Sequence, residues 1–379
     1  MTALGRTVVL IGIVAWIVGA KLGWKEMMIV AAACVIALAI SAFFTLGRTQ
    51  LRVATAIVPP RVVAGERAVG EFTVTNVGKR RMLPVRLELP IGRAFASIDV
   101  PSLAHDHSFE EVIVIPTTRR AVIQVGPTRS VRGDPLGLMR REVKWADELE
   151  LFVHPQTSRL QGVASGWLRD LEGRPTNDRS PTDVAFHTLR EYVPGDDRRH
   201  VHWRTSARLN KLMVRQFIDN RRSHLGIVVD TDPGNYSDAD EFELAVSMAA
   251  SLGLRAIVDG QETSCVAGSA GVASHNGQAL LDGLARVELG VPAIDIQQTA
   301  LRAAPVVNSA SVIAVVTGSA LSLAEVQLAA QRFGSDPAIL CVRAATDEEP
   351  YIQRASRLQA LTANSLDTFT RVMWTVGNS

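Results

Sequence analysis

Cysteine is scarce in this sequence, and neither sign of charge predominates. The 379 residues include only three cysteines, Cys34, Cys265 and Cys341, which lie far apart. This spacing excludes a CxxC metal site, offers no disulfide framework and suits a reducing compartment. The 40 basic and 38 acidic residues leave a formal net charge of +2. Overall charge therefore points to no anionic partner, and only local charge patterns are informative.

A run that is uncharged throughout lies near the N-terminus, at Met27–Leu46 (MMIVAAACVIALAISAFFTL). A helix with a rise of roughly 1.5 Å per residue would make this run about 30 Å long, which is the thickness of a hydrocarbon core. Before it, the shorter run Thr7–Ala20 extends through Lys21, which can snorkel, to Trp24 at the interface. We therefore predict a transmembrane helical hairpin in residues 1–48, with spans at about 7–24 and 27–46.

The residues that flank these two runs indicate whether the first run is cleaved and how the runs are oriented in a membrane. Arg6, the first apolar run and the small Ala20 also fit a cleaved signal peptide, which is the alternative for that run. The second full span favours the hairpin instead. Basic residues comprise Lys21 and Lys25 in the turn, and Arg6, Arg48, Arg52 and Arg61 on the flanks. The positive-inside bias then predicts a multi-pass plasma-membrane protein whose ends and soluble domains are cytoplasmic.

Residues 50–155 are typical of an all-β module. Short β-branched runs such as AVGEFTVTNVG, PVRLELP and ELELFVHP are separated by Gly, Pro and Asn, which predicts antiparallel strands folded as an Ig-like sandwich. Alternation in the first run places Phe72, Val74 and Asn76 on one face. The stretch RGDPLGLMRR contains an Arg-Gly-Asp tripeptide, but Gly-Asp-Pro favours a turn that the aspartate caps locally.

The rest of the chain divides into a connector and an α/β domain. Residues 156–222 are rich in Gly, Ser, Arg and Pro at first and then carry a charged segment. In residues 223–379, apolar runs such as LGIVVD, SVIAVVTG and AILCVR alternate with helical spacing in ADEFELAVSMAASLGLRAI. This alternation predicts a doubly wound, largely parallel sheet, closed by a helix near SLDTFTRVMWTV.

The charged segment is LREYVPGDDRRHVHWRTSARLNKLMVRQF, from Leu189 to Phe217. Either Asp196 or Asp197 is expected to cap a following helix, because carboxylates are favoured at a helix N-terminus. Four-residue spacing would give that helix one basic face, formed by His200, Arg204 and Arg208. A strand is expected to follow a tight turn at Asn210 and Lys211.

Chemical roles for this segment compete with a structural one. A metal-dependent hydrolase could use Asp197, His200 and His202, but residues i and i+2 of a helix point apart and cannot both reach one ion. Nucleic-acid binding would use the arginines, yet carboxylates interleave with them, whereas a phosphate-binding stripe should be more one-signed. An Arg–carboxylate network that docks domains or partners fits the alternation better.

A second candidate site is DTDPG, Asp230–Gly234, directly after the first strand of the α/β domain. The carboxyl ends of parallel strands are where open α/β sheets bind ligands. A von Willebrand A-type site for Mg²⁺ uses Asp-x-Ser-x-Ser here; this chain keeps Asp230 but has Asp232 and Gly234 for the two serines. Near VVTGSA only Thr317 and Ser319 are available. An Asp-capped turn is therefore favoured over a degenerate Mg²⁺ site at Asp230 and Asp232.

Several of these segments resemble one known family. RGDPLGLMRR, LFVHP, the core FHTLREYVPGDDRRHVHWRTSARLNKLMVRQF and the strand LGIVVDTD are similar to bacterial membrane proteins with the domain of unknown function 58 (DUF58). The order of Arg-Glu-Tyr, Pro-Gly-Asp-Asp, Trp and Ser-Ala-Arg is specific, and the resemblance covers essentially the whole chain. It implies a membrane-anchored β-sandwich followed by a von Willebrand A-like, Rossmann-like domain.

The resemblance also implies partners, namely a MoxR-type AAA+ ATPase and often a transglutaminase-like membrane protein. We therefore expect a non-enzymatic, cofactor-free scaffold or chaperone-like protein that binds protein partners. The alternative is a membrane-associated metal-dependent hydrolase or nuclease, or an anion- or nucleic-acid-binding protein. Trp203 is the expected buried anchor of the partner-binding residues, which we call the signature surface. These are Glu191, Tyr192, Asp196, Asp197, Arg198, Trp203, Ser206, Ala207 and Arg208.

Overall fold

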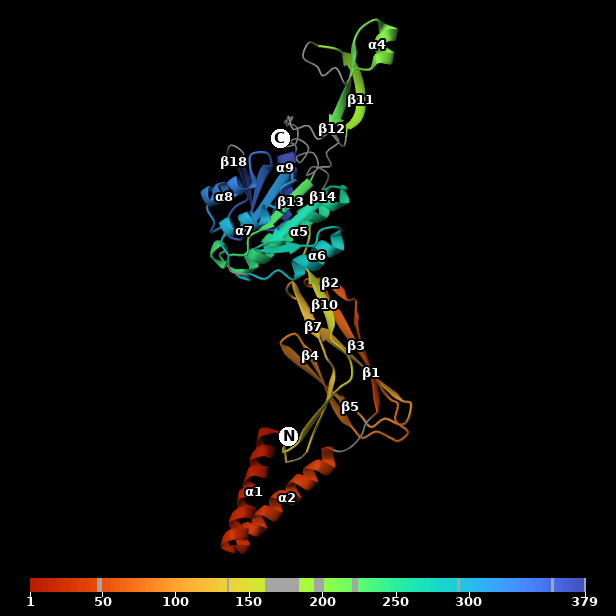
Figure 1. Ribbon diagram of the computed structural model, residues 1–379, viewed down its shortest axis with the longest axis vertical. Coiled ribbons are helices and arrows are strands. Elements are labelled where there is room, and N and C mark those ends of the chain that lie inside the picture. Colours follow the sequence, from red (N-terminus) through yellow and green to blue (C-terminus); the bar gives the residue numbers. More distant parts are fainter. Residues whose placement is uncertain are drawn as a thin grey trace. The chain divides into compact units, whose positions relative to one another are not determined.

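The computed structural model (Figure 1) divides into a first unit, Met1–Pro155, and a second unit, Gln156–Ser379. The residues that it describes are 1–45, 50–134, 136–160, 184–193, 201–219, 224–291, 294–355 and 358–377.

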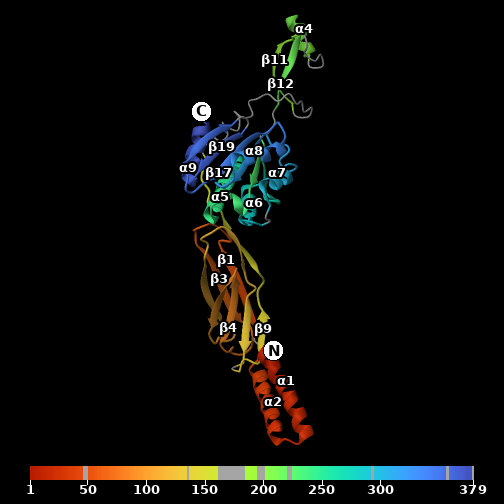
Figure 2. The same cartoon turned by 90° about the vertical axis from the view of Figure 1, so that its left-hand side faces the viewer.

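Two apolar helices begin the first unit, as predicted. Helix α1 covers Ala3–Leu22 and α2 covers Lys25–Thr45, and Figure 2 shows them side by side as a hairpin. Glycines bring the two backbones close: a Cβ at Gly12 would lie 3.1 Å from the Cys34 Cβ. Both helices are long and apolar enough to cross a membrane. They begin a few residues earlier than the predicted spans.

Two β-sheets follow in the first unit. One consists of β1 (Leu51–Val58), β3 (Ala68–Asn76) and β6 (Ser108–Ile115). The other contains, in spatial order, β2 (Arg61–Val63), β10 (Leu149–His154), β7 (Ala121–Val125), β4 (Val85–Ile91), β8 (Arg129–Gly133) and β9 (Arg140–Lys144), with β5 (Ala94–Val100) also on β4.

The two sheets share a core. One cluster joins Leu51, Phe72 and Val74 of the first sheet to Leu87 and Ile98 of the second. The side chains of β3 alternate in burial, with Phe72, Val74 and Asn76 all buried, so the predicted face is confirmed. The all-β region is therefore present, while its Ig-like assignment stays a prediction.

The second unit opens with residues that were predicted to be a connector. Ser158 N donates to Ser251 Oγ at 3.0 Å, and Leu160 is buried in the α/β core. An antiparallel pair follows, β11 (Val184–Glu191) and β12 (Met213–Asp219), with helix α4 (Trp203–Leu209) between the two strands in the chain. β12 was predicted from the sequence, whereas β11 was not.

The predicted, largely parallel sheet is present in the second unit. Its order is β15-β14-β13-β16-β17-β19-β18. The neighbours among β14, β13, β16, β17 and β19 are parallel, whereas β15 and β18 are antiparallel edge strands. The strands are β13 (His224–Val229), β14 (Glu262–Ala267), β15 (Ala270–Val272), β16 (Val312–Thr317), β17 (Ala338–Ala344), β18 (Tyr351–Ala355) and β19 (Leu358–Ala363).

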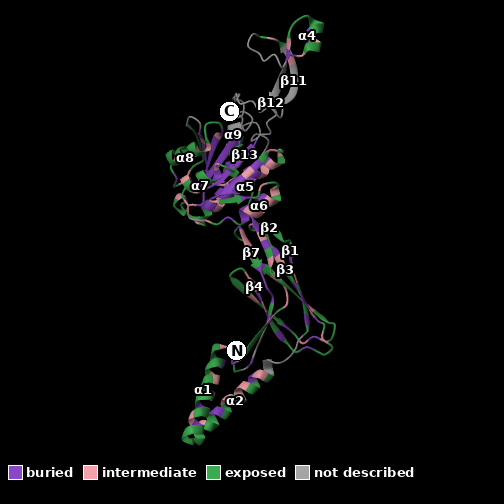
Figure 3. Cartoon of the chain, viewed as in Figure 1, coloured by how far each residue is buried: buried purple, intermediate pink, exposed green. Residues whose placement is uncertain are grey.

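Helices cover both faces of this sheet, and the strands are its most buried part (Figure 3). Helices α5 (Ala239–Val258), α6 (Gly277–Ala285) and α9 (Leu366–Gly377) share one core cluster with Ile227 and Val229. Helices α7 (Ile296–Ala303) and α8 (Leu323–Ala330) share the other with Val228 and Ile313. All residues of β13 are buried, which explains why its sequence is a continuous apolar run rather than an alternating one.

Candidate functional site

The carboxyl edge of the parallel sheet gathers buried polar side chains from several strands. Asp230 follows β13 and is fully buried. Its Oδ1 accepts from the Asp232 N–H at 3.0 Å, and its Oδ2 accepts from Asn235 Nδ2 at 2.7 Å and Thr317 Oγ1 at 2.8 Å. Burial raises the pKa of Asp230, against the effect of these hydrogen bonds. Thr317 therefore donates a hydrogen bond to Asp230.

Asp232 has a local structural role. Its Oδ1 accepts from the Gly234 N–H at 3.0 Å and caps the short 3₁₀ turn η2 (Pro233–Asn235). The favoured prediction of an Asp-capped turn is therefore confirmed. Both Asp230 oxygens are occupied by protein donors, and the described part of the chain contains no group of three or more His, Cys, Asp or Glu residues that could hold a metal ion. The predicted alternative, Mg²⁺ at Asp230 and Asp232, does not fit this arrangement.

A second buried carboxylate, Glu241, lies in the first turn of α5. It accepts hydrogen bonds from the backbone and hydroxyl groups of Ser237 and Ser319, including one of 3.0 Å from Ser319 Oγ. The positive end of the α5 dipole also favours a carboxylate here. Glu241 therefore connects the start of α5 to the loop after β16.

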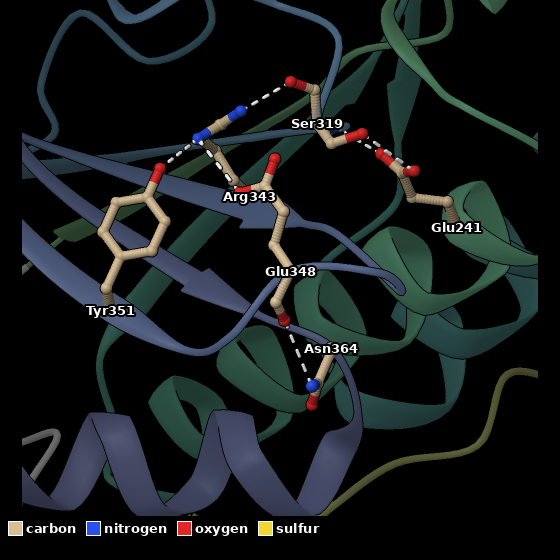
Figure 4. Close-up of polar contacts among 6 residues, drawn as sticks. All are labelled: Glu241, Ser319, Arg343, Glu348, Tyr351 and Asn364. Atoms are coloured by element: carbon tan, nitrogen blue, oxygen red, sulfur yellow. Dashed lines mark hydrogen bonds and ion pairs between the residues drawn. The ribbon is translucent and has the colours of Figure 1, made fainter.

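Arg343 continues this network across the sheet edge, as Figure 4 shows. Arg343 is only 8% exposed, and its side chain donates to Ser319 O and to the Tyr351 hydroxyl at 2.5 Å each. The Glu348 carboxylate lies 3.9 Å away. Asn364 Nδ2, after β19, donates to Glu348 O at 3.2 Å. We call Glu241, Ser319, Arg343, Glu348, Tyr351 and Asn364 the edge network.

Sequence reasoning named Ser319 but missed Glu241 and Arg343. One local signal was available, because Arg343 interrupts the apolar run AILCVRA of a buried strand. A charged residue inside such a run is buried and must be paired if the strand prediction holds. The identity of its partners depends on the fold, which brings Ser319, Glu348 and Tyr351 to the Arg343 side chain.

In the charged segment, the structure corrects the predicted helix. Helix α4 begins at Trp203, and its N-cap is His202, whose Nδ1 accepts from the Thr205 N–H at 3.2 Å. Val201 forms a β-bridge with Val214 instead of a helical turn. The prediction that Arg204 and Arg208 share one helix with His200 is therefore wrong, because α4 begins after Val201. Asp196, Asp197, Arg198 and His200 themselves lie outside the described residues.

The end of α4 agrees with the prediction. Asn210 has φ of 51° and ends the helix in the left-handed conformation, after which β12 begins at Met213. The buried Ser206 ties helix to strand: its Oγ donates to His202 O at 3.1 Å and accepts from the Met213 N–H at 2.8 Å. The Asn210–Lys211 turn and the following strand are thus confirmed.

The described residues include only part of the signature surface. Trp203 is 68% exposed, so its prediction as a buried anchor is wrong for the chain by itself. Ala207 and Arg208 are also exposed. Lys211 Nζ lies 3.3 Å from Glu191 Oε1, and the Tyr192 N–H donates to Leu212 O at 2.8 Å. These contacts hold the ends of β11 and β12 together beside α4.

These features define a protein with an apolar helical hairpin, a β-rich region and an α/β region with a mixed sheet. Residues 188–316 match the model of the family described as "Protein of unknown function DUF58". This match agrees with the family resemblance that the motifs indicated. The match covers β12, α4 and most of the α/β region up to β16.

A curated relative matches across a similar length. The "Uncharacterized protein YeaD" of Bacillus subtilis is 26% identical over 198 residues, which are 48% of this chain and 48% of that protein. The match thus spans about half the length of this relative.

Two solved structures align with a smaller part of the chain. The CARDB domain of a Pyrococcus furiosus protein is 15% identical, with a TM-score of 0.22, over 28% of this chain and 93% of that domain. The putative ApaA protein of Bordetella pertussis is 18% identical, with a TM-score of 0.20, over 28% of this chain and 94% of that one. At these TM-scores neither establishes a shared fold.

Proposed function

We propose that the chain is a membrane-anchored, non-enzymatic scaffold whose second unit binds a protein partner in the cytoplasm. The AAA+ ATPase of MoxR type implied by the family resemblance is the partner to test first. The transglutaminase-like membrane protein is a further candidate. In this proposal α1 and α2 anchor the chain in the plasma membrane, and the signature surface contacts the partner.

The observation that carries the proposal is the exposure of α4. Trp203 is 68% and Leu209 57% exposed, and Leu212, just after the helix, is 45% exposed. Exposed Arg204 and Arg208 lie on the same short helix. Trp and Arg are enriched among the residues that dominate protein–protein binding, whereas an exposed apolar cluster without a partner costs solubility.

The arrangement at the sheet edge also supports a non-catalytic role. Asp230, Glu241 and Arg343 all have protein partners that explain their burial. A general acid, base or nucleophile needs geometry that reaches a substrate. In the edge network, by contrast, the charged groups link neighbouring loops to each other.

The proposal predicts that AAA+ ATPase capture depends on Trp203. Full-length protein in detergent-solubilised membranes would be used to capture partners with and without ATP, followed by identification of the captured ATPase. Truncating a tryptophan at the centre of an interface costs about 2–4 kcal/mol, so Trp203→Ala should reduce capture at least about tenfold. The matched control is Trp374→Ala, because Trp374 is also 54% exposed but lies outside the family match.

Retention of the ATPase by Trp374→Ala and its loss from Trp203→Ala is the expected result. If neither nucleotide state yields an AAA+ ATPase with the wild-type chain, the proposed partner is wrong. Equal capture of the ATPase by both variants would show that Trp203 of α4 does not contribute to the interface.

A further inference from the structure

A turn of the β-rich region is joined directly to the helical hairpin. It connects β8 to β9, and we call Asp134 together with residues 136–139 the junction turn. Thr2 N and Thr2 Oγ1 donate to Leu138 O at 3.1 Å and to Gly137 O at 2.7 Å, respectively. Thr2 is also the N-cap of α1. A Cβ at Gly5 would collide with the Leu138 carbonyl oxygen, so glycine permits this close approach.

The Asp134 carboxylate organises the junction turn and bonds it to the second helix. Its Oδ2 accepts from the N–H groups of Leu136 at 3.0 Å and Leu138 at 3.2 Å, and from Ser41 Oγ at 2.8 Å. Its Oδ1 accepts from the Met139 N–H at 2.5 Å. Ser41 is fully buried. The predicted local capping by this aspartate is therefore confirmed, and the same side chain reaches α2.

These contacts place the junction turn at the ends of both apolar helices. Gly5 is in the first turn of α1, and Ser41 is four residues before the end of α2, which is about 6 Å along the axis. Arg6, exposed in the first turn of α1, places charge at the same level. In a bilayer spanned by α1 and α2, this level is the boundary between headgroups and hydrocarbon.

Apolar side chains are exposed at this level. Leu136 in the junction turn is 51% exposed, Leu4 on α1 is 56% exposed, and Phe43 on α2 is 80% exposed. The N–H groups of Leu138 and Met139 are bonded to Asp134, so these two polar groups do not oppose contact with lipid. An exposed leucine at the tip of a turn that is fixed beside two apolar helices is suited to a lipid surface.

We propose that the junction turn is a third membrane contact, in which Leu136 enters the lipid interface beside the ends of α1 and α2. The proposal rests on the proposed function only in that the two helices span the bilayer. The role of this contact is to fix the β-rich region against the membrane surface. The junction turn and the ends of both helices then lie at the same boundary between headgroups and hydrocarbon.

Depth-dependent fluorescence quenching tests this contact in the full chain. Single cysteines, introduced as Leu136→Cys, Val35→Cys or Phe95→Cys in a Cys34→Ala background, would carry an environment-sensitive fluorophore. The protein would be reconstituted in phosphatidylcholine vesicles with a nitroxide either near the headgroup or near the end of the acyl chain. Burial raises the pKa of Cys265 and Cys341 to about 12, so these two thiols are poor labelling sites.

The two reference positions are chosen for opposite outcomes. Val35 is in the middle of α2 and 65% exposed, so it reports whether the helix spans. Phe95 is 75% exposed and pairs with Pro90 at the end of β4, whereas β8 runs toward the start of β4. The register thus places Phe95 roughly 20 Å from the junction turn along the strand. Circular dichroism of each labelled protein would verify that it is folded.

The proposal predicts a blue-shifted label at position 136 that the shallow nitroxide quenches more than the deep one. The label at position 35 should be quenched more by the deep nitroxide, and the label at position 95 by neither. An unquenched label at 136 together with deep quenching at 35 would overturn the junction-turn proposal and leave the span intact. An unquenched label at 35 would refute the span, and the junction-turn proposal with it.

Discussion

Glu241 and Arg343 are buried charges whose free-energy cost is offset by specific hydrogen bonds. Burying a charge is unfavourable unless it is paired and bonded. Glu241 meets this condition through Ser237 and Ser319, and Arg343 through Ser319 O, Tyr351 and Glu348. Arg343 Nε has no hydrogen-bond partner among the described residues. The two charges therefore differ in how completely the protein compensates them.

Replacement of Glu241 should destabilise the second unit. Glu241→Ala would leave the Ser319 and Ser237 N–H groups without their acceptor, and each unsatisfied buried group costs about 1–3 kcal/mol. We expect a loss of about 3 kcal/mol, measured by denaturant unfolding. Glu241→Gln is the graded control, since it keeps one acceptor oxygen and should lose less. Equal losses for both variants would show that the charge, and not the acceptor, is what matters.

Asp134 should make the first unit sensitive to acid. Burial raises the pKa of its carboxyl group, but hydrogen bonds from Met139 N, Ser41 Oγ and Leu138 N outweigh this effect and lower the pKa to about 2, from 3.8. Because the pKa is lower in the folded state, the stabilisation is complete above about pH 4 and is lost as the pH falls toward 2. Unfolding of wild type and Asp134→Asn at pH 5, 4, 3 and 2 would measure it. The difference between them should shrink across this interval; a constant difference would contradict the shifted pKa.

Helix α4 shows how a short element depends on its ends. A helix of seven residues is marginal by itself, so its caps and its contact with a strand must hold it. His202 caps one end, Asn210 closes the other, and Ser206 joins the helix to Met213. The exposed Trp203 contributes little to this internal stability. The binding role that we propose for α4 and its internal stability thus depend on different side chains.

Ser206→Ala should loosen the β11–α4–β12 segment without unfolding the α/β region. The Met213 N–H would lose its acceptor, at a cost of about 1–3 kcal/mol. Hydrogen exchange at Met213 and Val214 should therefore become faster, while exchange in β13 stays unchanged. Ala207→Ser is the matched control, since residue 207 is exposed and surface substitutions usually change stability by less than about 0.5 kcal/mol. Faster exchange in both variants would contradict this role for Ser206.

The elements that the sequence predicted well are those with a strong period. β13 is a continuous apolar run, and α5 repeats apolar residues at helical spacing, so local pattern and tertiary burial agree. The start of α4 was predicted wrongly because Val201 pairs with Val214 across the strand, a non-local contact that overrides helical propensity. β11 was missed since VAFHTLRE mixes polar and apolar residues and depends on β12 as a partner.

Only those contacts of the candidate site that join residues close in sequence could be predicted. The Asp232 turn follows from five consecutive residues, DTDPG. The edge network joins Glu241, Ser319 and Arg343, and no spacing in the sequence indicates that these three residues meet. Their contact follows from the strand order, which places the ends of β16 and β17 side by side, and from the hydrogen bonds of Ser319 to Glu241 in the first turn of α5.

The whole molecule is built from two units that each have their own core. The clusters around Phe72 and Leu89 contain residues of the first unit alone, and those around Ile227 and Val228 residues of the second alone. Units with separate cores are expected to unfold separately. The chain is therefore expected to lack a single stability value.

Calorimetry of the full chain in detergent should show two transitions. Asp134→Asn is expected to shift only the transition of the first unit, and Glu241→Ala only that of the second. A destabilisation of 1 kcal/mol lowers the midpoint of a domain of 150–250 residues by about 2–4 °C, so shifts of several degrees are measurable. A single transition that both variants move would show that the two units unfold together.

The place of β13 in its sheet has a consequence for protein synthesis. β13 pairs with β16, and Leu225 is opposite Val312. During translation, β13 therefore lacks one of its two neighbours until the chain has grown past Thr317, and non-local pairing of this kind folds slowly. α1 and α2 emerge from the ribosome long before that point. If the hairpin inserts as it emerges, the sheet of the second unit completes its folding while the nascent chain is already tethered to the bilayer.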